Sequence, residues 1–111
     1  MTFDTLDVVV VPFPFADRET SKRRPALVVS SADFNAAHEQ SILTMITSVR
    51  APWPSDVDIQ DWQGVGLSVP CKVRFKLFTV DDGMIVRRIG SLSTRDARAI
   101  RTALSRVLAT A

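Results

Sequence analysis

The chain of 111 residues has one cysteine, one histidine and four glycines, and each shortage excludes a kind of site. Cys71 has no partner for a disulfide within the chain, and no Cys/His cluster exists to hold zinc. With His38 as the single histidine, a metal-centred mechanism would have to rest on carboxylates. No glycine-rich loop has the spacing that cradles phosphates. We therefore expect neither a metal nor another cofactor.

The sequence also lacks the signals that direct a chain to a membrane. No apolar run approaches the roughly 20 residues that span a bilayer. Residues 1–7 lack the basic and apolar regions of a signal peptide. Hydrophobic content of 46% and charged content of 23% are typical of a soluble globular protein. We expect a single domain over residues 1–111, in the cytoplasm and without contact to a membrane.

The formal net charge is only +2, so the total charge says little about partners. The distribution of the charges along the chain says more. Arginines crowd the C-terminal quarter: Arg87, Arg88, Arg95, Arg98, Arg101 and Arg106. Aspartates lie in the middle of the chain: Asp56, Asp58, Asp61, Asp81 and Asp82. Such a distribution allows a local basic face that binds RNA or DNA despite the modest total.

Apolar, β-branched runs predict five or six short strands in a small, strongly curved sheet or barrel. The expected strands are Asp7–Phe15, a second strand opened by Pro25 and ending at Ser30, Ile42–Val49, a half-exposed strand through Val57 and Ile59, Val73–Val80, and Met84–Val86. Asp81-Asp82-Gly83 indicates a turn that joins the last two strands in a hairpin. A polar loop is expected over 16–23 and a short helix near 31–39.

After Gly90 the apolar residues recur at intervals of three and four, which predicts a helix over about 93–108 with one apolar stripe. The stripe contains Ala97, Ile100, Ala103, Leu104, Val107 and Leu108. Ser93 and Asp96 resemble a capping box in which Asp replaces the usual Glu. The chain is thus expected to be mainly β with a short helix and a C-terminal helix.

The run Lys22-Arg23-Arg24-Pro25 stands directly before an apolar strand. Pro25 has no N–H to donate, so it belongs at the first position of that strand, and it biases Arg24 toward an extended backbone. A guanidinium held at the mouth of a strand suits a phosphate, which it can grip with two hydrogen bonds. The alternative interpretation is a solvated run of charges after a loop.

Thr47 and Arg74 also fall at or near strand ends. An arginine and a hydroxyl aimed at one point can bind a phosphate. If that phosphate belongs to RNA, the 2′-OH is the nucleophile, and the protein must stabilise charge and manage two protons. The other candidates have plainer interpretations: His38 is expected in solvent, Asp81 and Asp82 form a turn, and Cys71 is either a reactive thiol or, more commonly, a buried structural cysteine.

Taken together, these motifs resemble the PemK/MazF family of toxins from bacterial type II toxin–antitoxin systems. The matching segments are Asp7-Val8-Val9, Phe13-Pro14-Phe15, the block from Lys22 to Ser30, Ile46-Thr47-Ser48, Val73-Arg74, Leu77-Phe78-Thr79-Val80, Ile89-Gly90 and Leu92-Ser93. They run from about residue 6 to residue 108. The resemblance implies a compact SH3-like barrel with a C-terminal helix that cuts single-stranded RNA without a metal and leaves a cyclic phosphate.

The resemblance also implies roles for individual residues. Arg24 and Thr47 would hold and polarise the scissile phosphate, and Arg74 matches an arginine with an acid or phosphate-binding role. The implied RNA-binding residues are Phe13 at the site entrance, Lys22 and Arg23 in the loop, and Trp53, which either stacks on an unpaired base or packs within the protein.

Two positions depart from the family pattern. Leu6 stands where the family usually has Gly before Asp7, and Lys76 stands where some members have Asp. Lys76 leaves no carboxylate base at that point, so the source of the general base is open. Two rival functions stay open as well: a non-enzymatic toxin of the CcdB type that binds a protein such as DNA gyrase, and an inactive nucleic-acid-binding relative.

Two partners besides RNA are expected. The first strand, Leu67, Val69 and Leu77 supply more apolar area than a chain of this length readily hides, which indicates a C2 homodimer. A cognate antitoxin with an acidic, partly disordered segment would compete with RNA for the basic groove.

Overall fold

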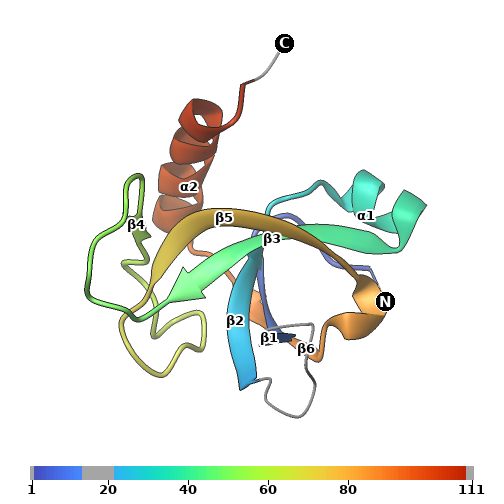
Figure 1. The fold of residues 1–111 in the computed structure, drawn as a ribbon, viewed down its shortest axis with the longest axis horizontal. Coiled ribbons are helices and arrows are strands. Elements are labelled where there is room, and N and C mark those ends of the chain that lie inside the picture. The colour runs from blue at the N-terminus through green and yellow to red at the C-terminus, as the bar shows by residue number, and fades with distance from the viewer. Residues whose placement is uncertain (1, 14–21, 110–111) are drawn as a thin grey trace.

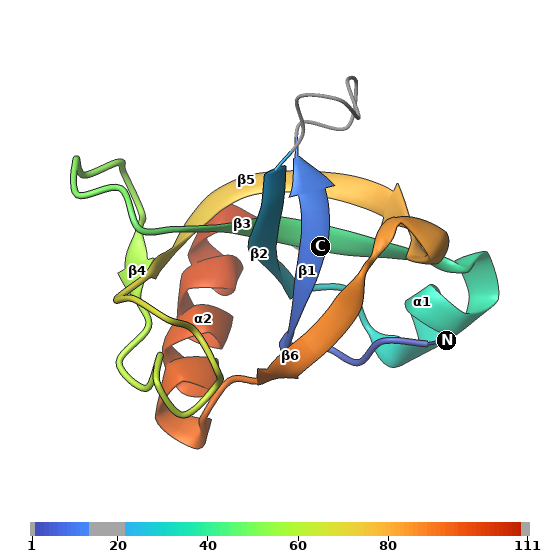
Figure 2. The same ribbon diagram turned by 90° about the horizontal axis from the view of Figure 1, so that it is seen from below.

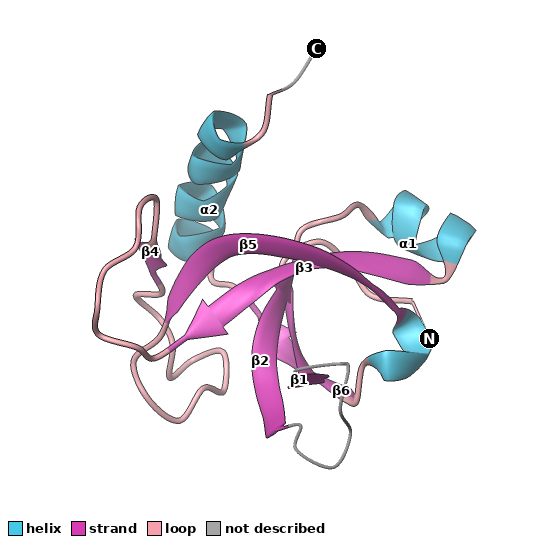
Figure 3. Ribbon diagram, viewed as in Figure 1, coloured by secondary structure: helices cyan, strands magenta, loops and turns pink. Residues whose placement is uncertain are grey.

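The computed structural model describes residues 2–13 and 22–109. In chain order its elements are β1 (Asp7–Phe13), β2 (Lys22–Val28), α1 (Ala32–His38), β3 (Gln40–Thr47), β4 (Val57–Asp58), β5 (Lys72–Asp81), the 3-10 turn η1 (Asp82–Met84), β6 (Arg87–Ser91) and α2 (Thr94–Val107). The strands form one antiparallel sheet in the order β4-β5-β3-β2-β1-β6. The sheet curls into a half-barrel with α1 and α2 at separate places around it (Figures 1 and 3). The mainly-β prediction with two helices is confirmed.

Two apolar clusters pack on the two faces of the curled sheet. Cluster one contains Leu6, Val8, Leu27, Ile46, Ile59, Val65, Leu67, Val73, Phe75 and Ile100. Cluster two contains Phe3, Val9, Val11, Ala26, Val28, Leu43, Val80 and Ile85. Helix α2 covers cluster one with Ile100, which is 1% exposed, and lies to one side of β1 and β2 in the second view (Figure 2). Because Val8 and Val9 point into different clusters, β1 is buried on both faces.

A β-bulge bends β5 at the point where it passes β3. Thr44 pairs with Leu77, but the next β3 residue, Met45, pairs with Arg74, so Phe75 and Lys76 are inserted between the two pairs. Such insertions bend the strand and increase its twist. The bend separates the end of β5 near α1 from the end that carries Arg74.

The predicted helices are confirmed with small shifts at their ends. Ser31 caps α1 by accepting a hydrogen bond from the N–H of Phe34 at 3.1 Å, and Ser93 caps α2 by accepting one from Asp96 at 3.3 Å. Asp96 does not complete a capping box. Its buried carboxylate instead accepts hydrogen bonds from the backbone N–H groups of Gln60 and Asp61, each at 2.9 Å. Asp96 therefore ties the start of α2 to the segment after β4.

The hairpin predicted at Asp81-Asp82-Gly83 is wrong. Asp82 begins η1, and the chain then crosses so that β6 pairs with β1 at the far edge of the sheet from β5. The expected half-exposed strand at 57–59 is shorter, since β4 ends at Asp58 and Ile59 is buried in cluster one.

The start of β2 also differs from the prediction. Lys22 and Arg23 belong to the strand and not to a loop, and Pro25 is its fourth residue, paired with Val10 of β1. The β2–β3 ladder comprises only the pairs from Ala26 to Val28, so Pro25 lies where β2 has a single neighbour. A proline is tolerated there for the same reason that it is tolerated in an edge strand. Residues 14 and 15 of the first predicted strand, and 16–21 of the predicted loop, lie outside the described residues.

Leu6 has a φ of 68°, in the left-handed region that favours glycine. The departure from a family glycine therefore places a branched side chain in a strained backbone conformation. The side chain is 4% exposed within cluster one, and the backbone N–H of Leu6 donates to the carbonyl of Val28 at 2.7 Å. Burial of the side chain offsets the strain.

The apolar area expected at a dimer interface is largely buried within one chain. The valines of β1 and Leu67 are buried, whereas Val69 and Leu77 are 46% and 36% exposed. The first strand and Leu67 thus lend no support to a dimer, and that part of the prediction is wrong. Val107 and Leu108 at the end of α2 are 36% and 45% exposed.

Candidate active site

One face of the sheet carries the predicted site residues. Side chains alternate between the faces along a strand. Phe13, Arg24 and Thr47 each lie an even number of residues from members of cluster two on their own strands, β1, β2 and β3. Three strands that neighbour each other in the sheet therefore present these side chains on the same face.

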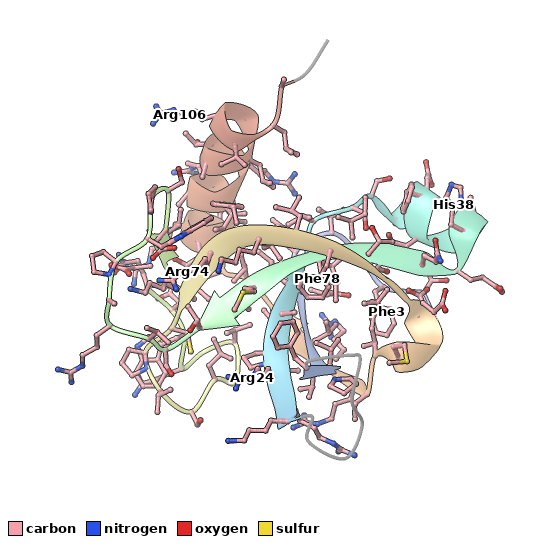
Figure 4. The ribbon with its side chains drawn as sticks, viewed as in Figure 1. Phe3, Arg24, His38, Arg74, Phe78 and Arg106 are labelled. Carbon is pink, nitrogen blue, oxygen red and sulfur yellow. The ribbon has the colours of Figure 1, made fainter. Side chains whose placement is uncertain are left out.

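Arg24 and Thr47 extend the β2–β3 ladder beyond its last pair. That pair is Ala26 with Met45, and in an antiparallel register the positions two residues further out are Arg24 and Thr47. Arg24 lines a small cavity of about 10 Å³ together with Met45, Phe13 and Phe78. Figure 4 shows Arg24 on β2, below the end of β3. The register thus supplies the juxtaposition that the sequence only suggested.

The polar groups of Arg24 and Thr47 are available to a ligand. Arg24 is exposed, and within residues 2–13 and 22–109 its guanidinium has no hydrogen bond or ion pair. The Thr47 hydroxyl is half-buried and accepts a hydrogen bond from the backbone N–H of Val49 at 3.2 Å. Because that contact uses a lone pair, the hydroxyl proton stays free to be donated.

Arg74 lies on β5 and is engaged by its neighbours. Its Nε donates to Oδ1 of Asp56 at 3.1 Å and its Nη2 donates to Oδ2 at 3.0 Å, a bidentate pair. Nη2 also donates to the carbonyl of Ala51 at 2.9 Å. Both side chains of the pair are 11% exposed. Arg74 therefore fastens the segment 51–56 to the sheet, and Figure 4 shows it across β3 from Arg24.

The charges around Asp56 reinforce one another. Hydrogen bonds from Arg74 outweigh the effect of burial and lower the pKa of Asp56, and the backbone N–H of Trp53 and the charge of Lys72 act in the same direction. The same carboxylate raises the pKa of Arg74. Lys72 Nζ lies 3.7 Å from Asp56 Oδ2. Asp56 was not singled out from the sequence, although its position three residues after Trp53 fits the turn that it closes with a 3.0 Å bond to that N–H.

Trp53 is 40% exposed and lies beside cations. Lys76 Nζ is 5.1 Å from the ring centroid and the guanidinium carbon of Arg74 is 5.9 Å from it. Both distances are within the range of cation–π attraction. The Trp53 ring thus contacts two cations of the protein while part of it faces solvent, and its stacking on an RNA base stays a prediction. Lys76, at the position where some family members have Asp, lies over this ring.

The remaining candidates are spread over the molecule. Lys22 and Arg23 are exposed at the start of β2, and alternation puts Arg23 on the face opposite to Arg24. His38 is exposed on α1 at the other side of the molecule, where its ring lies 4.4 Å from that of Phe34 (Figure 4). Cys71 is half-buried, and burial raises the pKa of its thiol.

Two features are absent from the residues that the structure describes. Among them, no three His, Cys, Asp or Glu side chains are grouped so that they could hold a metal ion. No helix in the described part of the chain combines the length and the apolar character that crossing a membrane requires.

Comparison with known proteins points in one direction. The model of the PemK-like, MazF-like toxins of type II toxin–antitoxin systems matches residues 4–108. The chain is similar in structure to MazF (Form I) from Deinococcus radiodurans, with a TM-score of 0.73, 23% identity and 96% of each chain covered. A MazE–MazF structure (Form III) from the same organism gives a TM-score of 0.79 at 19% identity, with 100% of each chain covered.

A further similar structure is an endoribonuclease from a mycobacterial species in complex with its cognate antitoxin. Its TM-score is 0.73 at 15% identity, covering 95% of this chain and 91% of that one. No curated protein sequence matched the chain. At these identities the structural matches show the shared fold.

Proposed function

Because the chain belongs to the family of PemK-like and MazF-like toxins of type II toxin–antitoxin systems, we propose that it is an endoribonuclease that cuts single-stranded RNA without a metal. The observation that carries the proposal is the placement of Arg24 and Thr47 on neighbouring strands and on one sheet face, just beyond the last β2–β3 pair. Similar structures that are endoribonucleases support the same function.

The proposed reaction uses the nucleophile that RNA itself carries. The 2′-OH attacks the adjacent phosphorus, the P–O5′ bond breaks, and the products are a 2′,3′-cyclic phosphate and a 5′-OH end. Arg24 stabilises the negative charge that develops on the non-bridging oxygens, and the Thr47 hydroxyl donates a second hydrogen bond to them. A base takes the proton of the 2′-OH and an acid gives one to the departing 5′ oxygen, so the reaction has no net change in protons.

For Arg74 we favour a positioning role over the direct one implied by the family resemblance. Two of its nitrogens already donate to Asp56 and Ala51, so its charge is largely satisfied. By fixing segment 51–56, Arg74 shapes the approach to the end of β3. Phe13 and Lys22, on the same face as Arg24, would contact the passing RNA, and Lys22 would add electrostatic attraction.

The proposed partners and location follow from the same site. Similar structures contain MazE or a cognate antitoxin, and an acidic antitoxin segment would suit Arg24 and its exposed neighbours Lys22 and Arg23. A homodimer in the cytoplasm stays part of the proposal, with exposed Val107 and Leu108 among the apolar groups that it could cover. Light scattering that shows a strict monomer in the active protein would contradict the dimer.

The test of the function is the chemistry of the cut. A long RNA is digested with the purified protein in excess EDTA, and the new ends are sequenced. A short RNA that contains the mapped site is then compared with the same RNA carrying one 2′-deoxyribose on the 5′ side of the cut. We expect cleavage in EDTA, a cyclic phosphate on the product, and no cut at the deoxy position. Cleavage of the deoxy substrate, or activity that magnesium must restore, would contradict the mechanism.

A further inference from the structure

A cavity of about 630 Å³ opens directly beside Thr47, on the side away from Arg24. Its walls come from the end of β3, from β4 and the residues after it, and from the start of β5. Cavities of this size hold small-molecule ligands. The cavity of about 10 Å³ at Arg24 is far smaller. A chain of RNA whose phosphate lies between Arg24 and Thr47 therefore finds room for a neighbouring nucleotide in the larger cavity beyond Thr47.

The walls of this cavity combine flat apolar surface with polar edges. Trp62 is half-buried against cluster one and lines the cavity together with Pro70. The Asp58 carboxylate and the Gln60 side-chain amide are exposed at the wall, and neither bonds to any other residue within the described ranges. Unpaired bases are recognised by stacking on aromatic rings and by hydrogen bonds to their edges.

Positive charge lies at the rim of the same cavity. Arg50 is exposed, and Lys72 donates to the carbonyls of Arg50 and Ala51 at 3.3 and 3.4 Å. Arg50 suits a sugar–phosphate backbone that enters the cavity from Thr47, whereas Lys72 is already paired with Asp56 at 3.7 Å. The Trp53 ring, by contrast, is engaged by Lys76 and Arg74. Trp62 is therefore the better placed of the two tryptophans for a base.

We propose that this cavity is the subsite for one nucleotide next to the scissile phosphate, and that Asp58 and Gln60 read the edge of its base. The inference rests on the proposed function. Asp58 accepts hydrogen bonds only, so the favoured base presents an N–H group to it, and Gln60 both donates and accepts. Asp58 and Gln60 thus determine sequence preference, whereas Arg24 and Thr47 act on the phosphate.

The first arm of the test compares cut-site preferences on a randomised RNA pool. Asp58→Asn and Gln60→Glu each reverse part of the hydrogen-bonding pattern while keeping the size of the side chain. We expect both to change the base preference at the same single position by roughly tenfold, the scale of a lost base-specific contact. Asp33→Asn, which removes a carboxylate on α1, should leave the preference unchanged. Unchanged preferences in both cavity variants would overturn the proposal.

The second arm uses binding, so that it stands even if the protein cuts no RNA. Cys71 lines the cavity and is the only thiol in the sequence, so N-ethylmaleimide labelling followed by mass spectrometry reports on this one place. We expect a non-cleavable 2′-O-methyl RNA pool to slow the labelling of Cys71. The control is Cys71→Ser combined with Ala37→Cys, whose thiol on α1 should label equally fast with and without RNA. Equal labelling of Cys71 with and without RNA would overturn the subsite, whereas a failure to cleave with Cys71 still protected would overturn only the nuclease.

Discussion

Two arginines on the cluster-two face of the sheet, Arg24 and Arg74, differ in what surrounds them. Arg24 is exposed at the outer end of β2, without a partner among the described residues. Arg74 is 11% exposed on β5 and makes three hydrogen bonds to Asp56 and Ala51. The first guanidinium can bind an incoming anion without breaking a protein contact. The second would have to give up its bidentate carboxylate first.

This difference separates a reacting group from a supporting one. A phosphate that approaches Arg24 gains charge-assisted hydrogen bonds directly. A phosphate that approaches Arg74 competes with a carboxylate held in place by the turn from Trp53 to Asp56. In the sequence, both arginines fall in motifs that suggest contact with a phosphate. Their hydrogen bonds in the structure distinguish them.

The largest expected effect is the loss of the Arg24 guanidinium. Arg24→Ala should lower the single-turnover cleavage rate by about 10²–10³, the usual cost of removing one charge-stabilising donor. The melting temperature should hardly change, because the side chain is exposed. Arg24→Lys keeps the positive charge but cannot form two parallel hydrogen bonds to a phosphate, so it should recover only part of the rate. Arg106→Ala on α2 is the control for general loss of positive charge, and an equal loss there would contradict a specific role.

A smaller effect on cleavage and a larger one on stability are expected at the Asp56–Arg74 pair. Arg74→Ala leaves the Asp56 carboxylate without its main partner and frees segment 51–56. We expect a lower melting temperature and a rate loss of roughly tenfold, below the 10²-fold that a 1 Å misplacement can cost. Thermal unfolding and cleavage are measured on the same samples. A loss of cleavage rate as large as that of Arg24→Ala, with the melting temperature unchanged, would show that Arg74 acts directly on the phosphate.

The pair also predicts a pH dependence of stability. Because the pKa of Asp56 is lower in the folded protein than its ordinary value of 3.8, its contribution is present above that value and is lost as the pH falls through the folded pKa. Wild type should therefore exceed Asp56→Asn in melting temperature by a constant amount near neutral pH. The advantage should shrink below about pH 4. A difference that stays constant down to pH 2 would show that the carboxylate charge is not responsible.

The smallest effect on stability is expected at an exposed ion pair that involves neither Arg24 nor Thr47. Arg95 binds Asp61 through two hydrogen bonds of 2.8 and 2.7 Å and lowers the pKa of Asp61 to about 2. The Arg95 side chain is 63% exposed, so solvent screens the attraction. Arg95→Ala should lower the melting temperature slightly at low salt and not at all in 1 M NaCl. A salt-independent loss would indicate packing in place of charge.

Local sequence signals predicted most of the elements but not how they are joined. The valines of β1, the caps at Ser31 and Ser93 and the three-and-four spacing of α2 each act within a few residues, so they could be recognised directly. The partner of a strand depends on long-range packing. For that reason the turn at Asp81-Asp82-Gly83 suggested a hairpin, while β6 in fact pairs with β1.

The residues of the candidate site also divide into those that local sequence motifs predict and those that only long-range packing brings together. Arg24 and Thr47 could be selected from the sequence because motif and residue type coincide there. Asp56 and Trp62 could not, since their importance comes from neighbours distant in sequence: Arg74 for the first, and the cavity beside Thr47 for the second. A proline cannot donate to a ladder, which predicts Pro25 at the start of its strand; it is the fourth residue of β2 instead, at a position where β2 pairs with β1 alone.

The central claim is that Arg24 and Thr47 act on one phosphate group from neighbouring strands. A double-mutant cycle tests it most directly, with single-turnover cleavage of one mapped RNA by wild type, Arg24→Ala, Thr47→Val and the double variant. If both residues stabilise the same charge, their effects are not independent, and the double variant should be about as slow as the slower single variant. Rate losses that simply multiply in the double variant would show that the two residues act separately and would contradict the account.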